Sequence, residues 1–179
     1  MTRIFQNTNS PFFHFCRFIH LSGLEHSDLT NYVLKKFKLR HMKVDANALK
    51  ELLITLDGHP YYSMKTLQIL YYYCLEKNIT TIDKTILEHA LDLAIFETRS
   101  YLDDVISRLK TKKHHYEVLY NLANNIKNTL HSVVLFKTYS ALEENGILTH
   151  IDRGVYKITD VFLKLYITNT PKSNISHRV

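Results

Sequence analysis

The stretch Leu56-Asp57-Gly58-His59-Pro60-Tyr61-Tyr62 decides how the chain around it folds. It lies between two segments whose apolar residues recur with helical spacing. Gly58 can take the left-handed conformation that ends a helix. Pro60 suits the first turn of the next helix, where its missing N–H costs nothing. The sequence therefore predicts a tight, stiff corner with His59 at its tip, and on these residues alone a plain helix–helix turn is the simpler interpretation.

Three helices are predicted around this corner. The first begins at a Ser27-Asp28 cap, because short polar side chains at that position accept the free N–H groups of a first turn. The second runs from an Asp45 cap to the corner. The third opens at Pro60 and ends near Asn78. All three show an apolar face, so we expect them to pack together.

A fourth helix completes this bundle. Thr81 or Asp83 caps it, and it reaches about Lys110 either as one long helix or as two helices with a bend near Arg99-Ser100. The predicted core of the bundle consists of apolar positions with helical spacing, among them Leu29, Tyr32, Val33, Phe37, Leu49, Leu52, Leu53, Met64, Leu67, Leu70, Tyr71, Cys74, Leu75, Ile86, Ala90, Leu93, Ala94, Leu102, Val105, Ile106 and Leu109.

The basic run at residues 110–115 marks the boundary to a second module, residues 113–168. This module has the order helix, turn, helix, hairpin, which is typical of a winged helix. Its second helix begins at a Ser132 cap. Two short alternating strands follow, joined by a turn at Asp152-Arg153-Gly154. The predicted fold class is mainly α: a helical bundle followed by a winged helix-turn-helix with a short β-hairpin.

The corner and the end of the chain resemble a known family. The run GHPYYSMKTLQIL from Gly58 is similar to the Gly-x-Pro corner of the helical lid in AAA+/STAND-type ATPases of archaea and bacteria. The stretch ALEENGIL…VYKITDVFLKLYI resembles the end of the winged module of that family, except that Val161 replaces a proline. The resemblance implies a lid-like bundle at residues 27–112, in which Gly58, His59 and Pro60 face a bound adenine nucleotide.

The chain lacks the parts of such an ATPase that hold and cleave ATP. It has no G-x-x-x-x-G-K-[ST] phosphate loop, no acidic run after a strand for Mg²⁺, and four glycines in total. ATP and Mg²⁺ thus belong to the parent family, and we expect this chain alone to use no cofactor and to catalyse no reaction. The resemblance implies a separate P-loop ATPase core, or another protein, as its partner.

Composition favours a packed, cytoplasmic protein. Of the 179 residues, 45% are hydrophobic and 12% are aromatic. No apolar run approaches the length of a membrane span, and polar residues interrupt the N-terminus, so we expect neither membrane insertion nor a signal peptide. Cys16 and Cys74 match no metal or redox spacing. The 11 histidines show no metal-binding pattern either, so the sequence predicts no metal site.

Nucleic acid is an alternative partner, because the formal net charge is +6. A winged helix would place Lys137 of its second helix in the major groove and Arg153 of the wing tip near phosphate. Residues 114–170, however, hold five Lys/Arg and five Asp/Glu, a poor balance for DNA. A solvated lysine face also explains the better electrostatic candidate, which consists of Lys35, Lys36, Lys38, Arg40 and Lys43.

The two ends of the chain carry separate predictions. Residues 1–26 resemble the last strand region of the ATPase core, and the segment 12–19 is FFHFCRFI. This arm is too apolar to be left in water, so we expect it to dock on the bundle or to make the chain self-associate. Residues 169–179 are predicted to form a disordered tail.

Three functions are compatible with these features. The first is a regulatory or interaction fragment of a STAND-type ATP-binding protein, with a nucleotide-facing corner and a winged helix. The second is a stand-alone winged-helix protein that binds nucleic acid. The third is one half of a complete ATPase. The sequence does not separate the first from the third.

Overall fold

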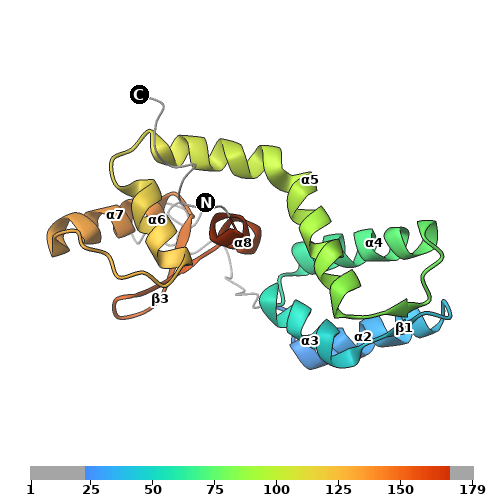
Figure 1. Cartoon of the computed structure of the whole chain (residues 1–179). Coiled ribbons are helices and arrows are strands. Elements are labelled where there is room, and N and C mark those ends of the chain that lie inside the picture. Colours follow the sequence, from blue (N-terminus) through green and yellow to red (C-terminus); the bar gives the residue numbers. More distant parts are fainter. Residues whose placement is uncertain (1–22, 170–179) are drawn as a thin grey trace, which may run out of the picture.

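Figure 1 shows the computed structural model, which describes residues 23–169 and is mainly helical, as predicted. The predicted arm at residues 12–19 and the tail from residue 170 lie outside the described residues, while Asn169 is the last residue of a helix. In chain order the elements are α2 (His26–Lys38), β1 (Lys43–Val44), α3 (Ala46–Thr55), α4 (Pro60–Glu76), β2 (Thr81–Ile82), α5 (Lys84–Lys110), α6 (His115–Ala123), α7 (Ser132–Glu144), β3 (Leu148–Asp152), β4 (Val155–Ile158) and α8 (Val161–Asn169).

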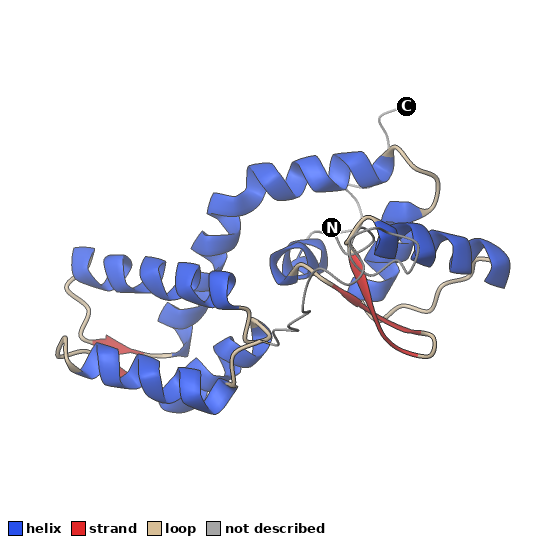
Figure 2. Cartoon of the chain, turned by 180° about the vertical axis from the view of Figure 1, so that it is seen from behind, coloured by secondary structure: helices blue, strands red, loops and turns tan. Residues whose placement is uncertain are grey.

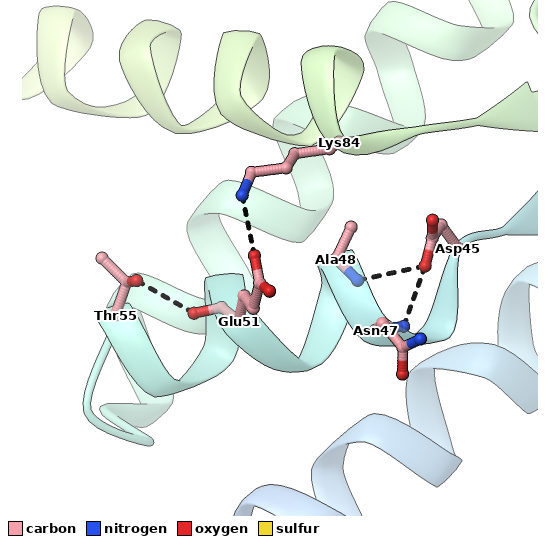
Figure 3. A network of polar contacts seen from close by, with 6 residues as sticks. All are labelled: Asp45, Asn47, Ala48, Glu51, Thr55 and Lys84. Atoms are coloured by element: carbon pink, nitrogen blue, oxygen red, sulfur yellow. Dashed lines mark hydrogen bonds and ion pairs between the residues drawn. The ribbon is translucent and has the colours of Figure 1, made fainter.

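Helix α3 begins where the sequence predicts. The Asp45 carboxylate accepts the N–H groups of Asn47 at 2.9 Å and of Ala48 at 3.1 Å, so it satisfies two donors of the first turn. One turn further on, Glu51 pairs with Lys84 at a distance of 2.8 Å. Figure 3 shows both features, and the pair joins α3 to the start of α5.

Two helix starts differ from the prediction by one or two residues. Helix α2 is capped by the carboxylate of Glu25 rather than at Ser27-Asp28, and its first residue is His26. Helix α7 begins at Ser132 itself, because the side chain of the preceding His131 accepts a backbone N–H in the cap position. In α5 the cap is Asp83, which decides between the two predicted alternatives.

Helices α2 to α5 form a bundle around a buried core that includes most of the predicted residues. Three predicted core residues are instead about half exposed: Tyr32 at 52%, Met64 at 50% and Leu75 at 47%. Apolar residues occur around much of the circumference of α4, but the bundle covers only one side of this helix. The broad apolar stripe in the sequence therefore predicts more buried residues on α4 than the structure has.

The bundle contains two short strands that the sequence did not predict, and its last helix follows one of the two predicted alternatives. Strands β1 and β2 pair in parallel, with Lys43 opposite Thr81 and Val44 opposite Ile82. At two residues each, they are too short to show an alternating pattern. Helix α5 is one continuous helix from residue 84 to 110, and it bends strongly along its length (Figures 1 and 2).

The remaining elements have the predicted order of helix, turn, helix and hairpin. Strands β3 and β4 are antiparallel, with Leu148 opposite Ile158, and Gly154 in their turn has a φ of +76°. Helix α8, which the sequence analysis did not assign, follows the hairpin and buries Phe162, Leu163 and Ile167. It lies between the hairpin and the bundle (Figure 1).

Helix α5 contacts both parts of the chain. It packs against α3 and α4 in the bundle and against α6 and α8 beyond it. The predicted division at residues 112 and 113 falls in the loop between α5 and α6. This division stays a prediction. Within residues 23–169, no helix combines the length and the apolar character that crossing a membrane requires.

Candidate functional site

The corner between α3 and α4 is built on two residues in the left-handed conformation. Asp57 has a φ of +56° and Gly58 a φ of +61°. The carbonyl oxygen of Gly58 accepts the N–H of Leu24 at 2.8 Å. A Cβ atom on Gly58 would lie 2.4 Å from the carbonyl oxygen of Leu24, so both the backbone angle and the close contact require glycine here. The corner therefore also fixes the point where residue 24 joins the bundle.

His59 and Pro60 start helix α4 as the sequence predicts. The Nδ1 atom of His59 accepts the N–H of Tyr62 at 3.5 Å, and Pro60 is the first residue of the helix. The ring of His59 packs against the ring of Tyr62 with 4.5 Å between their centroids. These contacts give both residues a structural role, and their predicted contact with a nucleotide stays a prediction.

Tyr62 connects the corner to α8. Its ring stacks on Phe162 with 4.1 Å between centroids and 22° between planes. Both side chains are buried. Burial, and then a hydrogen bond with Asp160, raise the pKa of the Tyr62 hydroxyl well above its usual value. Asp160 also accepts the N–H of Leu163 at 3.0 Å, so one carboxylate caps α8 and holds Tyr62.

Two polar contacts reinforce this joint between the parts of the chain. Asp57 of the corner forms an ion pair with Lys157 of β4. The hydroxyl of Tyr166 on α8 donates to Asp103 of α5 at 2.7 Å. Pairs of this exposure contribute little free energy, about 0–1 kcal/mol, so they orient the two parts more than they stabilise them. We call the set Asp57, Tyr62, Lys157, Asp160 and Phe162 the corner joint.

The exposed surface at the start of α7 is largely apolar, whereas that of a DNA reader would be basic. Val133 is 55% exposed, Val134 is 38% exposed and Phe136 is 65% exposed. Lys137 is exposed beside them, and Arg153 is exposed in the turn of the hairpin. The helix ends in Glu143 and Glu144, as the sequence shows. We call Val133, Val134 and Phe136 the α7 face.

The lysine-rich face lies elsewhere in the molecule. Its members are all exposed, and none takes part in an ion pair within residues 23–169: Lys35, Lys36, Lys38, Arg40 and Lys43. Lys36 also lies over the ring of Tyr32 at 5.3 Å. Helix α2 and helix α7 lie at opposite ends of the molecule (Figures 1 and 2). The structure therefore does not bring the two sets of predicted nucleic-acid residues together.

The described part of the chain shows no group of three or more His, Cys, Asp or Glu side chains placed to hold a metal ion. Cys74 is a buried free thiol whose pKa is raised by that burial. No protein-family model, curated protein or solved structure matches the chain. The resemblance to AAA+/STAND ATPases thus rests on the corner and on the C-terminal stretch of the sequence.

Proposed function

We propose that this chain is a regulatory or interaction module related to STAND-type ATP-binding proteins. It does not catalyse a reaction alone, and its C-terminal part is a winged helix that binds a separate P-loop ATPase core. The observation that carries this proposal is the α7 face, which exposes apolar side chains on the helix that would otherwise read DNA.

The chemistry of the α7 face fits a protein partner. Affinity for DNA comes largely from Lys and Arg side chains that neutralise phosphates. Val133, Val134 and Phe136 contribute no charge, and Glu143 and Glu144 would repel phosphate. Grouped apolar side chains on a surface instead mark contacts with other proteins, whose interface cores are enriched in aromatic residues. Phe136, at 65% exposure, is the anchor of this contact.

The corner joint supplies the regulatory link. In the proposal, Gly58, His59 and Pro60 face the nucleotide that the partner core holds, and that core supplies Mg²⁺ as well. Asp57 and Tyr62, directly beside them, contact Lys157 and Phe162. A displacement of the corner on nucleotide exchange would therefore pass to α8 and the hairpin through packed side chains.

Affinity purification from the cells that make the protein tests the proposal. We expect the tagged full chain to retain a P-loop ATPase and to retain different amounts of it with ATP and with ADP. Phe136→Glu should abolish the retention. Phe96→Glu is the matched control, because Phe96 is 67% exposed on α5, outside the α7 face. Retention of no P-loop ATPase, or equal loss in both variants, would contradict the proposal.

Calorimetry with ATP tests the second part, that the chain is not catalytic alone. Without a phosphate loop, no backbone N–H cradle or lysine holds the triphosphate, so we expect no tight binding and no hydrolysis. Micromolar ATP affinity that Pro60→Ala abolishes would overturn this part.

Nucleic-acid binding is the second candidate function. One observation favours it: the five cations of the lysine-rich face are exposed and lack ion-pair partners within residues 23–169. Such a face attracts phosphate without reading sequence.

A further inference from the structure

Helix α4 carries an apolar face that no part of residues 23–169 covers. Tyr61 is 60% exposed, Met64 is 50%, Tyr72 is 59% and Leu75 is 47%. Their spacing of three to eight residues keeps them along one side of the helix. Tyr61, Met64 and Tyr72 line an open groove of about 900 Å³, whose lining also includes Gln68 from the middle of the helix. We call this surface the α4 groove.

We propose that residues 12–19 of this chain bind in the α4 groove. The first reason is where the described chain begins. Gly23 and Leu24 lie against the corner: the Leu24 N–H donates to the Gly58 carbonyl at 2.8 Å, and a Cβ on Gly23 would lie 2.7 Å from the Asp57 carbonyl oxygen. Helix α4 starts at Pro60, so the described chain begins beside the end of α4 at which the groove starts.

The lengths agree as well. From Tyr61 to Tyr72 the groove runs about 17 Å along the helix, at 1.5 Å per residue. Residues 12–19 span at most about 26 Å when extended. Three residues separate Ile19 from Gly23, so the tether spans four Cα–Cα steps and reaches at most about 14 Å. The segment therefore reaches the first turn of α4 and can follow the groove to its far end.

The composition of the segment suits the groove. It contains five large apolar side chains in eight residues, Phe12, Phe13, Phe15, Phe18 and Ile19. No acidic residue occurs before Glu25, while Arg17 carries a positive charge. Glu97 and Lys65 both line the groove and pair with each other at 3.3 Å. The Glu97 side chain is still 55% exposed in this pair, so it can also contact Arg17.

The tether favours this segment over a second copy of the chain. A short linker holds the two groups that it joins at an effective concentration in the millimolar range. The same segment on another molecule competes from the bulk concentration of the protein. At micromolar protein concentrations, binding within one chain is therefore favoured over binding between two chains. This requires a linker that can reach the groove, and the lengths above meet that requirement.

A disulfide test uses a thiol that the chain already has. Cys16 lies in the middle of the segment, and Cys74 is fully buried. Gln68→Cys places a thiol in the groove. Lys50→Cys is the control, because it places a thiol at an exposed position of α3, outside the groove. Both positions lie on the order of 12 Å from the corner along their helices. Disulfide formation requires the two Cα atoms to approach within about 7 Å. Mild oxidation of each full-length variant, followed by proteolysis and mass spectrometry, identifies the bond.

We expect Gln68→Cys to bond to Cys16 of the same chain at least about tenfold faster than Lys50→Cys does, because burying even one large apolar side chain favours the bound state by about that factor. Adding Met64→Glu to Gln68→Cys should slow the bond by a similar factor. Equal rates at positions 50 and 68, or no effect of Met64→Glu, would overturn the proposal. A bond between isotopically labelled and unlabelled chains would also overturn it and would assign the groove to a second copy.

Discussion

The ring of Tyr62 stacks on the ring of Phe162, with 4.1 Å between centroids, although the two residues lie far apart in the sequence, Tyr62 in α4 and Phe162 in α8. Tyr62 is in the first turn of α4, and Phe162 is in the first turn of α8. Their contact joins the corner to the part of the chain that follows the hairpin. It is also the hydrophobic centre of the corner joint, since both rings are buried.

Truncation of Phe162 should therefore destabilise the protein strongly. Phe162→Ala is expected to lower the free energy of unfolding by about 3–5 kcal/mol, the range for a buried aromatic side chain. Tyr62→Phe keeps the stacking and removes the hydroxyl that bonds to Asp160, so about 0.5–3 kcal/mol is expected. Urea denaturation followed by circular dichroism measures both.

A double-mutant cycle isolates the stacking itself. Tyr62→Ala and Phe162→Ala, alone and together, should show a coupling energy of about 0.5–1.5 kcal/mol. Phe96→Ala is the control, because Phe96 is 67% exposed, and it should change the stability by less than about 0.5 kcal/mol. Independent losses from Tyr62 and Phe162 would show that the two rings do not act together.

The corner was predictable because its signals are local. Glycine and proline restrict the backbone wherever they occur, so Gly58 and Pro60 fixed the turn without any tertiary information. Asp45 and Asp83 likewise cap helices through atoms two or three residues away. By contrast, His131 caps α7, although Ser, Thr, Asp and Asn are the residues usually preferred at this position. Because Ser132 was predicted as the cap, the predicted start of α7 is one residue late.

The partners of the corner were not predictable in the same way. Asp160 before an apolar run is a helix-start signal that the sequence analysis did not use, and it would have indicated α8. No local pattern, however, pairs Asp57 with Lys157. Such contacts depend on how the elements after α5 pack back against it and against the corner, which is a tertiary property. The exposure of the α7 face was not predictable either. The spacing of apolar residues indicates which side of a helix is apolar, but it does not indicate whether another element covers that side.

Replacing Gly58 should cost more than replacing a glycine with the same backbone requirement in open space. Gly58 and Gly154 both have positive φ angles, +61° and +76°. A Cβ on Gly154 would meet nothing within 4 Å, whereas one on Gly58 would lie 2.4 Å from a backbone oxygen. We expect Gly154→Ala to cost about 1–2 kcal/mol and Gly58→Ala distinctly more. Equal midpoints of thermal unfolding in the two variants would refute this difference.

His115 should make the protein less stable in mild acid. Burial, and then the charge of Lys112, lower the pKa of His115 below its usual 6.5. As the pH falls below about 6.5, the unfolded chain takes up a proton at this residue before the folded protein does. The stability that the neutral side chain provides is thus present above that pH and is lost as the pH falls through the folded pKa.

Unfolding in urea at pH 7.5 and at pH 5.5 measures this loss. His115→Gln should reduce the difference between the two pH values, because glutamine does not titrate. His89→Gln, at an exposed position on α5, should leave the difference as in the unaltered protein. If His115→Gln keeps the full pH dependence, another group is responsible.

The last prediction concerns nucleic acid. The lysine-rich face and the α7 face lie at opposite ends of the molecule, so basic attraction and a potential reading helix are separated (Figure 1). We therefore expect weak binding that depends on salt and does not distinguish duplex sequences. Each phosphate that is neutralised makes log K fall by about 0.9 per unit of log salt concentration.

Charge reversals at the two ends separate their contributions. Lys35→Glu, Lys36→Glu and Lys38→Glu together should weaken the binding and flatten its salt dependence, since they remove three cations that form no ion pair within residues 23–169. Lys137→Glu with Arg153→Glu should have a smaller effect, because these two residues sit beside apolar and acidic side chains. Titration of labelled duplexes at two salt concentrations decides between the surfaces. Nanomolar, sequence-selective binding that is lost with Lys137→Glu would show that α7 reads DNA, and it would replace the interaction module with a DNA-binding function.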